Sequence, residues 1–135
     1  MTKIERFEDI DAWKTARILT SKIYSHSAEG PFSRDFGLRD QLRRAAVSVM
    51  SNVAEGFERG GDKEFLQFLS LAKASCAEVR SHLYVALDQA YLTRKQFEEL
   101  NGQAETAGKM LAGFMSYLRK SEFRGNKFRQ ASDSK

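Results

Sequence analysis

The chain has 135 residues, of which 41% are hydrophobic and 30% charged, and its formal net charge is +4 at pH 7. This length suits one domain that encloses its own core, and the composition argues against a disordered chain. The sequence lacks both the roughly 18 uninterrupted apolar residues of a membrane span and the apolar start of a secretory signal, so we expect a cytoplasmic protein without membrane contact.

Three breaks divide the chain into four segments. The only proline, Pro31, lies in residues 29–33 and ends the first segment. Paired glycines at positions 60 and 61 separate the second segment from the third, and residues 91–94 separate the third from the fourth. At that last break, Thr93 and Gln96 have the spacing of a capping box, which marks the start of a helix.

Each segment carries a stripe of apolar or small residues at spacings of three and four. The stripes run from Ile10 to Ile23, from Leu38 to Val53, from Phe65 to Ala90 and from Phe97 to Leu118. A mean period near 3.5 is typical of helices that pack at small crossing angles. Because an isolated helix is marginal in water, the stripes should bury one another. The sequence therefore predicts an all-α, antiparallel, up-down-up-down four-helix bundle without strands.

The predicted helices cover about residues 9–27, 35–58, 62–91 and 94–120, which form the bundle domain 1–120. Residues 121–135 are expected to form a basic, flexible C-terminal tail. Residues 119–135 hold six of the 22 basic residues and two of the 18 acidic ones, so this segment has a charge of +4 and the rest holds 16 of each sign. Such a segment suits nucleic acid or another acidic surface, or else it is a solvated tail that binds nothing.

The sequence contains few residues that could act in catalysis. His26 and His82 have no ligand residue four positions further on, and no Glu-x-x-His pair is present. Cys76 lies on the apolar stripe, where a thiol acts as a small hydrophobe. The paired glycines lack the spacing of a phosphate-binding loop. The sequence therefore predicts no enzymatic activity, no metal site and no cofactor.

A row of polar residues runs along the second predicted helix at spacings of three and four. Short Ser and Asn side chains have modest helix propensity, so they are unusual choices for a solvated face. The row is therefore either an exposed face or a buried polar seam or subunit interface, in which charges such as Glu55 and Arg59 pair. Its members are Arg44, Ser48, Asn52, Glu55 and Arg59.

The same stretch resembles the signature of the bacterial 23S rRNA intervening-sequence protein family, also called the S23 family. The matching residues are Gln41-Leu42-Arg43-Arg44-Ala45-Ala46-Val47-Ser48 and Ser51-Asn52-Val53-Ala54-Glu55-Gly56. Further similar positions, from about residue 7 to 118, are Phe7, Trp13, Ala16, Tyr24, Phe36-Gly37-Leu38, Phe65, Phe68-Leu69 and Ala77-Glu78. Met50 departs from a frequent proline, and Ala74 from a frequent glycine.

The resemblance implies a four-helix bundle that assembles into a ring-like homopentamer with a basic surface or channel. Family members are encoded in insertions in ribosomal RNA genes or elsewhere in bacterial genomes. A related branch, the accessory variability determinant of diversity-generating retroelements, binds nucleic acid and a reverse transcriptase. Fivefold repetition of a +4 segment would bring about +20 to one assembly, which strengthens phosphate binding.

We therefore expect a non-enzymatic, homo-oligomeric module that binds RNA or DNA through phosphate contacts with low sequence specificity. The alternative is a protein–protein adaptor or scaffold, for example for a reverse transcriptase, with nucleic-acid binding incidental. Basic residues supply the phosphate contacts and two phenylalanines could stack on unpaired bases. The candidate contacts are Arg39, Arg43, Lys120, Phe123, Arg124, Lys127, Phe128 and Arg129.

Overall fold

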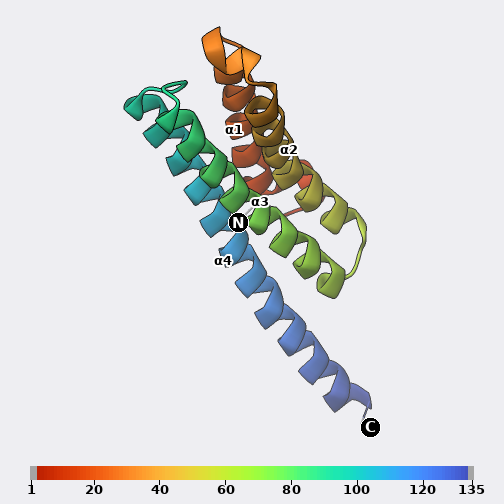
Figure 1. The fold of residues 1–135 in the computed structure, drawn as a ribbon. Helices are drawn as coiled ribbons and strands as arrows, with labels where there is room; N and C mark the ends of the chain where they lie inside the picture. Colours follow the sequence, from red (N-terminus) through yellow and green to blue (C-terminus); the bar gives the residue numbers. More distant parts are fainter. Residues whose placement is uncertain (1–2, 134–135) are drawn as a thin grey trace.

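Four helices form the molecule, as the apolar stripes predict. The computed structural model describes the backbone of residues 3–133 and the side chains of residues 3–121. The helices are α1 (Asp11–Ser27), α2 (Phe36–Glu58), α3 (Asp62–Asp88) and α4 (Arg94–Asp133), and short 3-10 turns cover Phe7–Asp9 and Gly30–Arg34. Consecutive helices run in opposite directions, α1 and α3 each packing against α2 and α4 (Figure 1). Residues 3–133 contain no strand.

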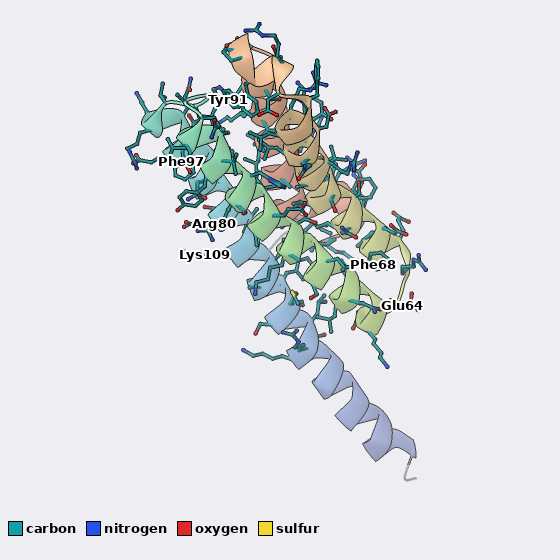
Figure 2. All side chains as sticks on the ribbon, in the orientation of Figure 1. Glu64, Phe68, Arg80, Tyr91, Phe97 and Lys109 are labelled. Carbon is teal, nitrogen blue, oxygen red and sulfur yellow. The ribbon has the colours of Figure 1, made fainter. Side chains whose placement is uncertain are left out.

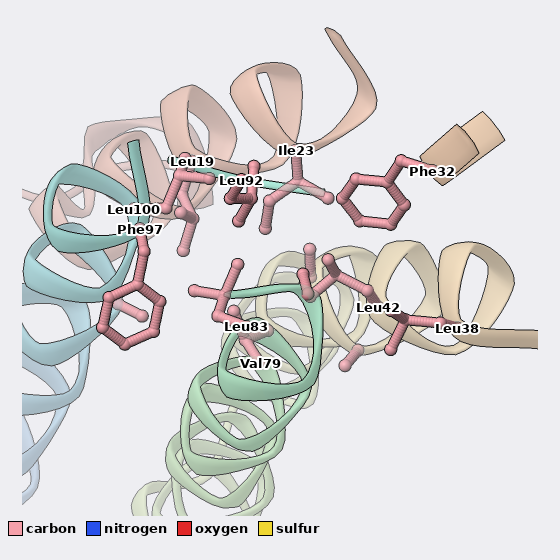
Figure 3. Packing of buried hydrophobic residues seen from close by; sticks show 14 residues of the cluster. Leu19, Ile23, Phe32, Leu38, Leu42, Val79, Leu83, Leu92, Phe97 and Leu100 are labelled. Atoms are coloured by element: carbon pink, nitrogen blue, oxygen red, sulfur yellow. The ribbon is translucent and has the colours of Figure 1, made fainter. Parts of the chain in front are cut away.

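The core is built from the predicted stripes and falls into two apolar clusters. One lies toward the end of the bundle that holds the Gly30–Arg34 turn, and Figure 3 shows Leu42, Val79, Leu83 and Leu100 converging there. The other lies around Val49, Leu69 and Leu111 toward the opposite end. Thr20 is buried as well, and its hydroxyl donates to the carbonyl oxygens of Ala16 at 2.7 Å and Ala46 at 3.3 Å.

The predicted third stripe fails only at its last position, Ala90, which is exposed. Helix α3 ends at Asp88 rather than at residue 91 because Ala90 adopts a left-handed conformation with φ of 62°. The Tyr91 N–H then donates to the Ala86 carbonyl and the Ala90 N–H to the Leu87 carbonyl, both at 2.9 Å. This is the hydrogen-bond pattern of a Schellman motif, which closes the helix by satisfying its last carbonyl groups.

The predicted capping box at the start of α4 is confirmed. The Thr93 N–H donates to Oε1 of Gln96 at 2.9 Å, and the Gln96 N–H donates to Oγ1 of Thr93 at 3.1 Å. At its other end α4 differs from the expectation, because it continues to Asp133 instead of ending near residue 120. Figure 1 shows this end projecting beyond the other three helices.

The composition of residues 121–133 does not by itself predict that the helix continues. This stretch contains no proline, but only six of its thirteen residues are Lys, Arg, Glu, Gln or Ala, and Gly125 and Asn126 are weak helix formers. Up to Asp133 the backbone of the basic C-terminal segment is helical and continuous with α4. Residues 134 and 135 of the predicted tail lie outside the described residues.

One carboxylate, that of Asp35, joins two connections at the end of the bundle. Its Oδ1 accepts from the Leu38 N–H at 3.2 Å and so caps α2, and its Oδ2 accepts from the Tyr91 hydroxyl at 3.0 Å. That hydrogen bond raises the pKa of Tyr91. The Tyr91 ring stacks on Phe32 of the Gly30–Arg34 turn, with centroids 5.2 Å apart. The start of α2 is thus fixed to the turn between α3 and α4.

Helices α2 and α3 approach each other closely where Gly56 faces two aromatic residues. A Cβ atom added to Gly56 would lie 2.6 Å from Cβ of Phe68 and 3.0 Å from Cδ1 of Phe65. The Phe68 Cβ is joined directly to the backbone, so it can move only if α3 moves. Only glycine fits at this position without separating the two helices.

The replacement Gly56→Ala should therefore lower the free energy of unfolding by about 2 kcal/mol, because it overpacks the contact between α2 and α3. Thermal or urea unfolding measures this change. The matched control is Gly113→Ala, since Gly113 of α4 has open space around its Cβ position. The control should raise stability by about 0.5–1 kcal/mol through helix propensity. Equal responses of the two variants would contradict the close approach.

Candidate functional site

The first candidate contact, Arg39, is held against the surface at the start of α2. Its guanidinium lies over the ring of Phe36, with Cζ 4.8 Å from the centroid. The Nε group donates to Oδ1 of Asp40 at 2.9 Å, and Nη1 donates to the Ser33 carbonyl at 3.0 Å. These bonds use two of the five N–H groups of the guanidinium, so the others can donate to a phosphate.

Arg43 lies one turn further along α2 and is held in the same way. Its Cζ lies 4.5 Å from the centroid of the Tyr24 ring. Nε donates to Oγ of the buried Ser27 at 2.8 Å, and Nη2 donates to the Tyr24 carbonyl at 3.4 Å. Arg43 thereby supplies donors to the C-terminal end of α1, where helix carbonyl groups lack partners and a cation is favoured.

The two arginines form a surface that combines positive charge with exposed aromatic rings. Phe36 is 61% exposed and Tyr24 is 42% exposed, so both rings remain available although a guanidinium covers part of each. Both arginines are among the predicted contacts, and the structure brings them together. Neither aromatic residue is among the predicted contacts, because a single Tyr or Phe in an amphipathic helix gives no signal of exposure.

The remaining predicted contacts lie on the last part of α4. Lys120 is exposed. The other candidates lie beyond residue 121, where the backbone is described but the side chains are outside the described residues. They are Phe123, Arg124, Lys127, Phe128 and Arg129.

The polar seam of α2 is a half-buried network between α2 and α3 rather than a fully solvated face. The Asn52 amide nitrogen donates to the Ser48 carbonyl at 2.9 Å and to its Oγ at 3.0 Å. Ser75 of α3 completes the network, since its Oγ donates to Oγ of Ser48 at 2.9 Å. Sequence reasoning missed Ser75 because its partners lie on another helix.

The charged members of the seam lie outside this network. Arg44 is exposed on α2. Glu55 and Arg59 form the predicted ion pair, with Oε1 and Nη2 3.0 Å apart. The Arg59 guanidinium also lies over the ring of Phe68, 5.1 Å from its centroid, next to the close contact at Gly56. This exposed pair contributes little to stability by itself, but it covers the end of the interface between α2 and α3.

His82 and Cys76 are two of the residues that the sequence offers for catalysis. Among the described residues no group of three or more His, Cys, Asp or Glu side chains is placed to hold a metal ion. His82 lies beside Glu78 of the preceding turn, with Nε2 and Oε1 3.4 Å apart. Cys76 is buried in the core, and burial raises the pKa of its thiol to about 11.

No helix in the described part of the chain is long and apolar enough to cross a bilayer.

Comparison with protein families gives a match to the 23S rRNA-intervening sequence protein model over residues 8–113. Among solved structures, the chain is similar to a protein of unknown function from the S23 ribosomal protein family of Bacteroides thetaiotaomicron. The two are 19% identical with a TM-score of 0.72, and the similarity covers 78% of this chain and 95% of the other. At this identity the similarity establishes the fold. Comparison with curated protein sequences gives no match.

The raised pKa predicts that Cys76 resists alkylation in the folded protein. At pH 8 a thiol with a pKa of about 11 has about one thiolate in a thousand molecules, and the thiolate is the reactive form. The reaction rate with iodoacetamide should rise about tenfold per pH unit until the pH reaches this pKa. Mass spectrometry measures the rate, with the protein in concentrated guanidinium chloride as control. Equal rates in the folded and unfolded protein would contradict the prediction.

Proposed function

Because the chain belongs to the 23S rRNA-intervening sequence protein family, we propose that it is a non-enzymatic, homo-oligomeric module that binds RNA or DNA through phosphate groups. The observation that carries this proposal is the pair of arginines on α2. Arg39 and Arg43 are each held over an exposed aromatic ring while part of the guanidinium stays free to donate. The hydrogen bonds that hold them reduce the entropy lost when a phosphate binds.

The chemistry of this surface favours a ligand that is a polyanion. Guanidinium groups bind phosphate oxygens in a planar, bidentate geometry, and an exposed ring beside them offers a stacking face for an unpaired base. Such contacts do not read base identity, so little sequence specificity is expected. The basic end of α4 adds a further net charge of +4 from residues 119–135. Nothing in this arrangement requires a nucleophile or a cofactor.

Self-association is the second part of the proposal, and the outer face of α3 supports it. Leu71 is 51% exposed and Val85 is 43% exposed, although both are large apolar residues. They lie four turns apart on the side of α3 that points away from the core, and the exposed Ala74, Glu78 and Ser81 lie between them. A subunit contact over this face would bury both apolar side chains, and Glu78 would need a partner there. We propose that a ring, with five subunits as the first expectation, buries this face.

The same face favours a second candidate function, in which the protein is an adaptor that scaffolds a partner such as a reverse transcriptase. In that case the apolar face of α3 binds the partner, and nucleic-acid binding is incidental. We also propose a cytoplasmic location for either function, because the one cysteine is a free thiol and a reducing compartment maintains it.

The double replacement Arg39→Gln/Arg43→Gln should weaken binding to a fluorescein-labelled, mixed-sequence RNA or DNA 30-mer about tenfold at moderate salt. The slope of log affinity against log salt concentration should fall by about 2, because two phosphate contacts are lost. Fluorescence anisotropy over a salt series measures both quantities. Arg17→Gln/Arg94→Gln is the matched control, since Arg17 also stacks on an aromatic ring, that of Trp13. Wild-type affinity that is independent of salt would contradict the proposed function.

Truncation after Leu118 separates the two candidate functions. It removes six basic and two acidic residues and leaves the buried part of α4 intact. If phosphate contacts determine function, affinity for the same oligonucleotides should fall at least tenfold, while light scattering still reports the mass of the wild-type assembly. Undiminished affinity together with retained capture of a purified protein partner would favour the adaptor.

A further inference from the structure

A shallow groove runs along the outside of the bundle between α3 and α4. Its floor consists mainly of small residues, and a Cβ atom added to Gly108 would lie 3.9 Å from Cβ of Cys76 on the other helix. Small residues keep the walls low, so an extended chain can approach both helix backbones closely. The groove is lined by Lys73, Cys76, Ala77 and Arg80 of α3 and by Ala104, Glu105, Gly108, Lys109 and Ala112 of α4.

The groove is positively charged on both walls. Lys73 extends from α3 and Lys109 from α4, and both are exposed. Neither lysine forms an ion pair with another described residue. The one carboxylate that lines the groove, Glu105, is paired with Arg80, with Oε1 and Nη2 3.0 Å apart. Lys73 and Lys109 therefore give the groove a net charge of +2.

Arg80 marks one end of this groove and is fixed in place. Its Nε donates to Oδ1 of Asn101 at 3.1 Å, and its Nη2 donates to Glu105. Its Nη1 group takes part in neither bond and keeps its N–H groups for another acceptor. Figure 2 labels Arg80 and Lys109 on the side of the bundle where α3 and α4 run together.

The positive charge continues from the groove toward the projecting end of α4. Residues 65–77 of α3 and 106–121 of α4 contain no Asp or Glu, but they contain four cations. Lys120 follows Lys109 by eleven residues, or about three turns, so the two lie on the same face of α4. From Lys109 to Lys120 the helix rises about 16 Å, enough for about five phosphates of one strand at the spacing of a duplex. The cations are Lys73, Lys109, Arg119 and Lys120.

We propose that the groove between α3 and α4 holds a strand of nucleic acid by its backbone, with Lys73 and Lys109 contacting phosphates from opposite walls. This inference rests on the proposed function and assigns it a second surface, separate from Arg39 and Arg43. The uncompensated charge argues for a polyanion over an apolar partner helix, because such a helix would leave both lysines desolvated. The length of the acid-free surface argues for a polymer rather than a single nucleotide.

The test uses the full-length protein with the double replacement Lys73→Gln/Lys109→Gln. Both side chains are exposed, so folding should be unaffected, and circular dichroism and light scattering verify this. We expect an affinity about tenfold weaker for a mixed-sequence 30-mer and a salt slope lower by about 1 to 2. The control, Lys14→Gln/Lys95→Gln, removes the same charge from α1 and from the first turn of α4 and should change affinity less than twofold.

Each outcome of this experiment has a distinct meaning. A selective loss of affinity in the groove variant, with its mass unchanged, supports the proposal. If wild-type and control proteins bind the oligonucleotide and the groove variant binds equally well, the groove is not a binding surface, although the proposed function stands. A change in assembly mass without a change in affinity would make the groove a contact between subunits and overturn the inference. Failure of the wild-type protein to bind would overturn both proposals.

Discussion

The structure depends on the mutual burial of four apolar stripes, and that burial is closest where α2 meets α3. Gly56 allows the two helices to approach until Phe65 and Phe68 close the space above it. At the opposite end, the Asp35 carboxylate joins the cap of α2 to the turn after α3. With the core fixed at both ends, the outer faces of the helices are free to carry charge without a cost in packing.

The charged residues lie in separate groups on these outer faces. On α2, Arg39 and Arg43 are oriented by aromatic rings and by carbonyl and hydroxyl oxygens from the neighbouring turn and α1, and Arg39 is also paired with the Asp40 carboxylate. On α3 and α4, Arg80 neutralises Glu105, and the lysines that line the same groove keep their charge. Within these surfaces Asp40 offsets the charge of Arg39, whereas Arg43, Lys73 and Lys109 form no ion pair with a described residue. Local charge determines where a phosphate backbone can bind.

The sequence predicts the fold well because hydrophobic periodicity is a property of each helix alone. The buried positions of α2 and α3 follow directly from the spacing of residues such as Leu42, Val49, Leu69 and Val79. The end of α3 could not be predicted, because alanine at position 90 gives no sign of a left-handed conformation. The expected end of α4 lies near Leu118, the last residue of the apolar stripe, whereas the helix continues to Asp133, and the composition of residues 121–133 gives no signal for this.

The candidate site was less predictable because its parts come from different helices. Arg39 and Arg43 were identified from charge, but Tyr24 and Phe36 became part of the site only when the packing of α1 against α2 was known. The polar network likewise needed Ser75, which lies 27 residues from Ser48. The groove forms because α3 packs beside α4, and this packing places Lys73 and Lys109 on its two sides. Sequence spacing within a single helix carries no information about such alignments.

The account centres on the claim that cationic surfaces on a rigid bundle bind a phosphate backbone, and photo-cross-linking tests it most directly. The full-length protein would be irradiated on a 4-thiouridine-substituted RNA of mixed sequence, digested and mapped by mass spectrometry. We expect cross-linked peptides from the start of α2, from the C-terminal end of α1 around Tyr24 and from the facing parts of α3 and α4, with few from the first half of α1. Cross-links concentrated on the first half of α1, or an absence of cross-links at low salt, would contradict this claim.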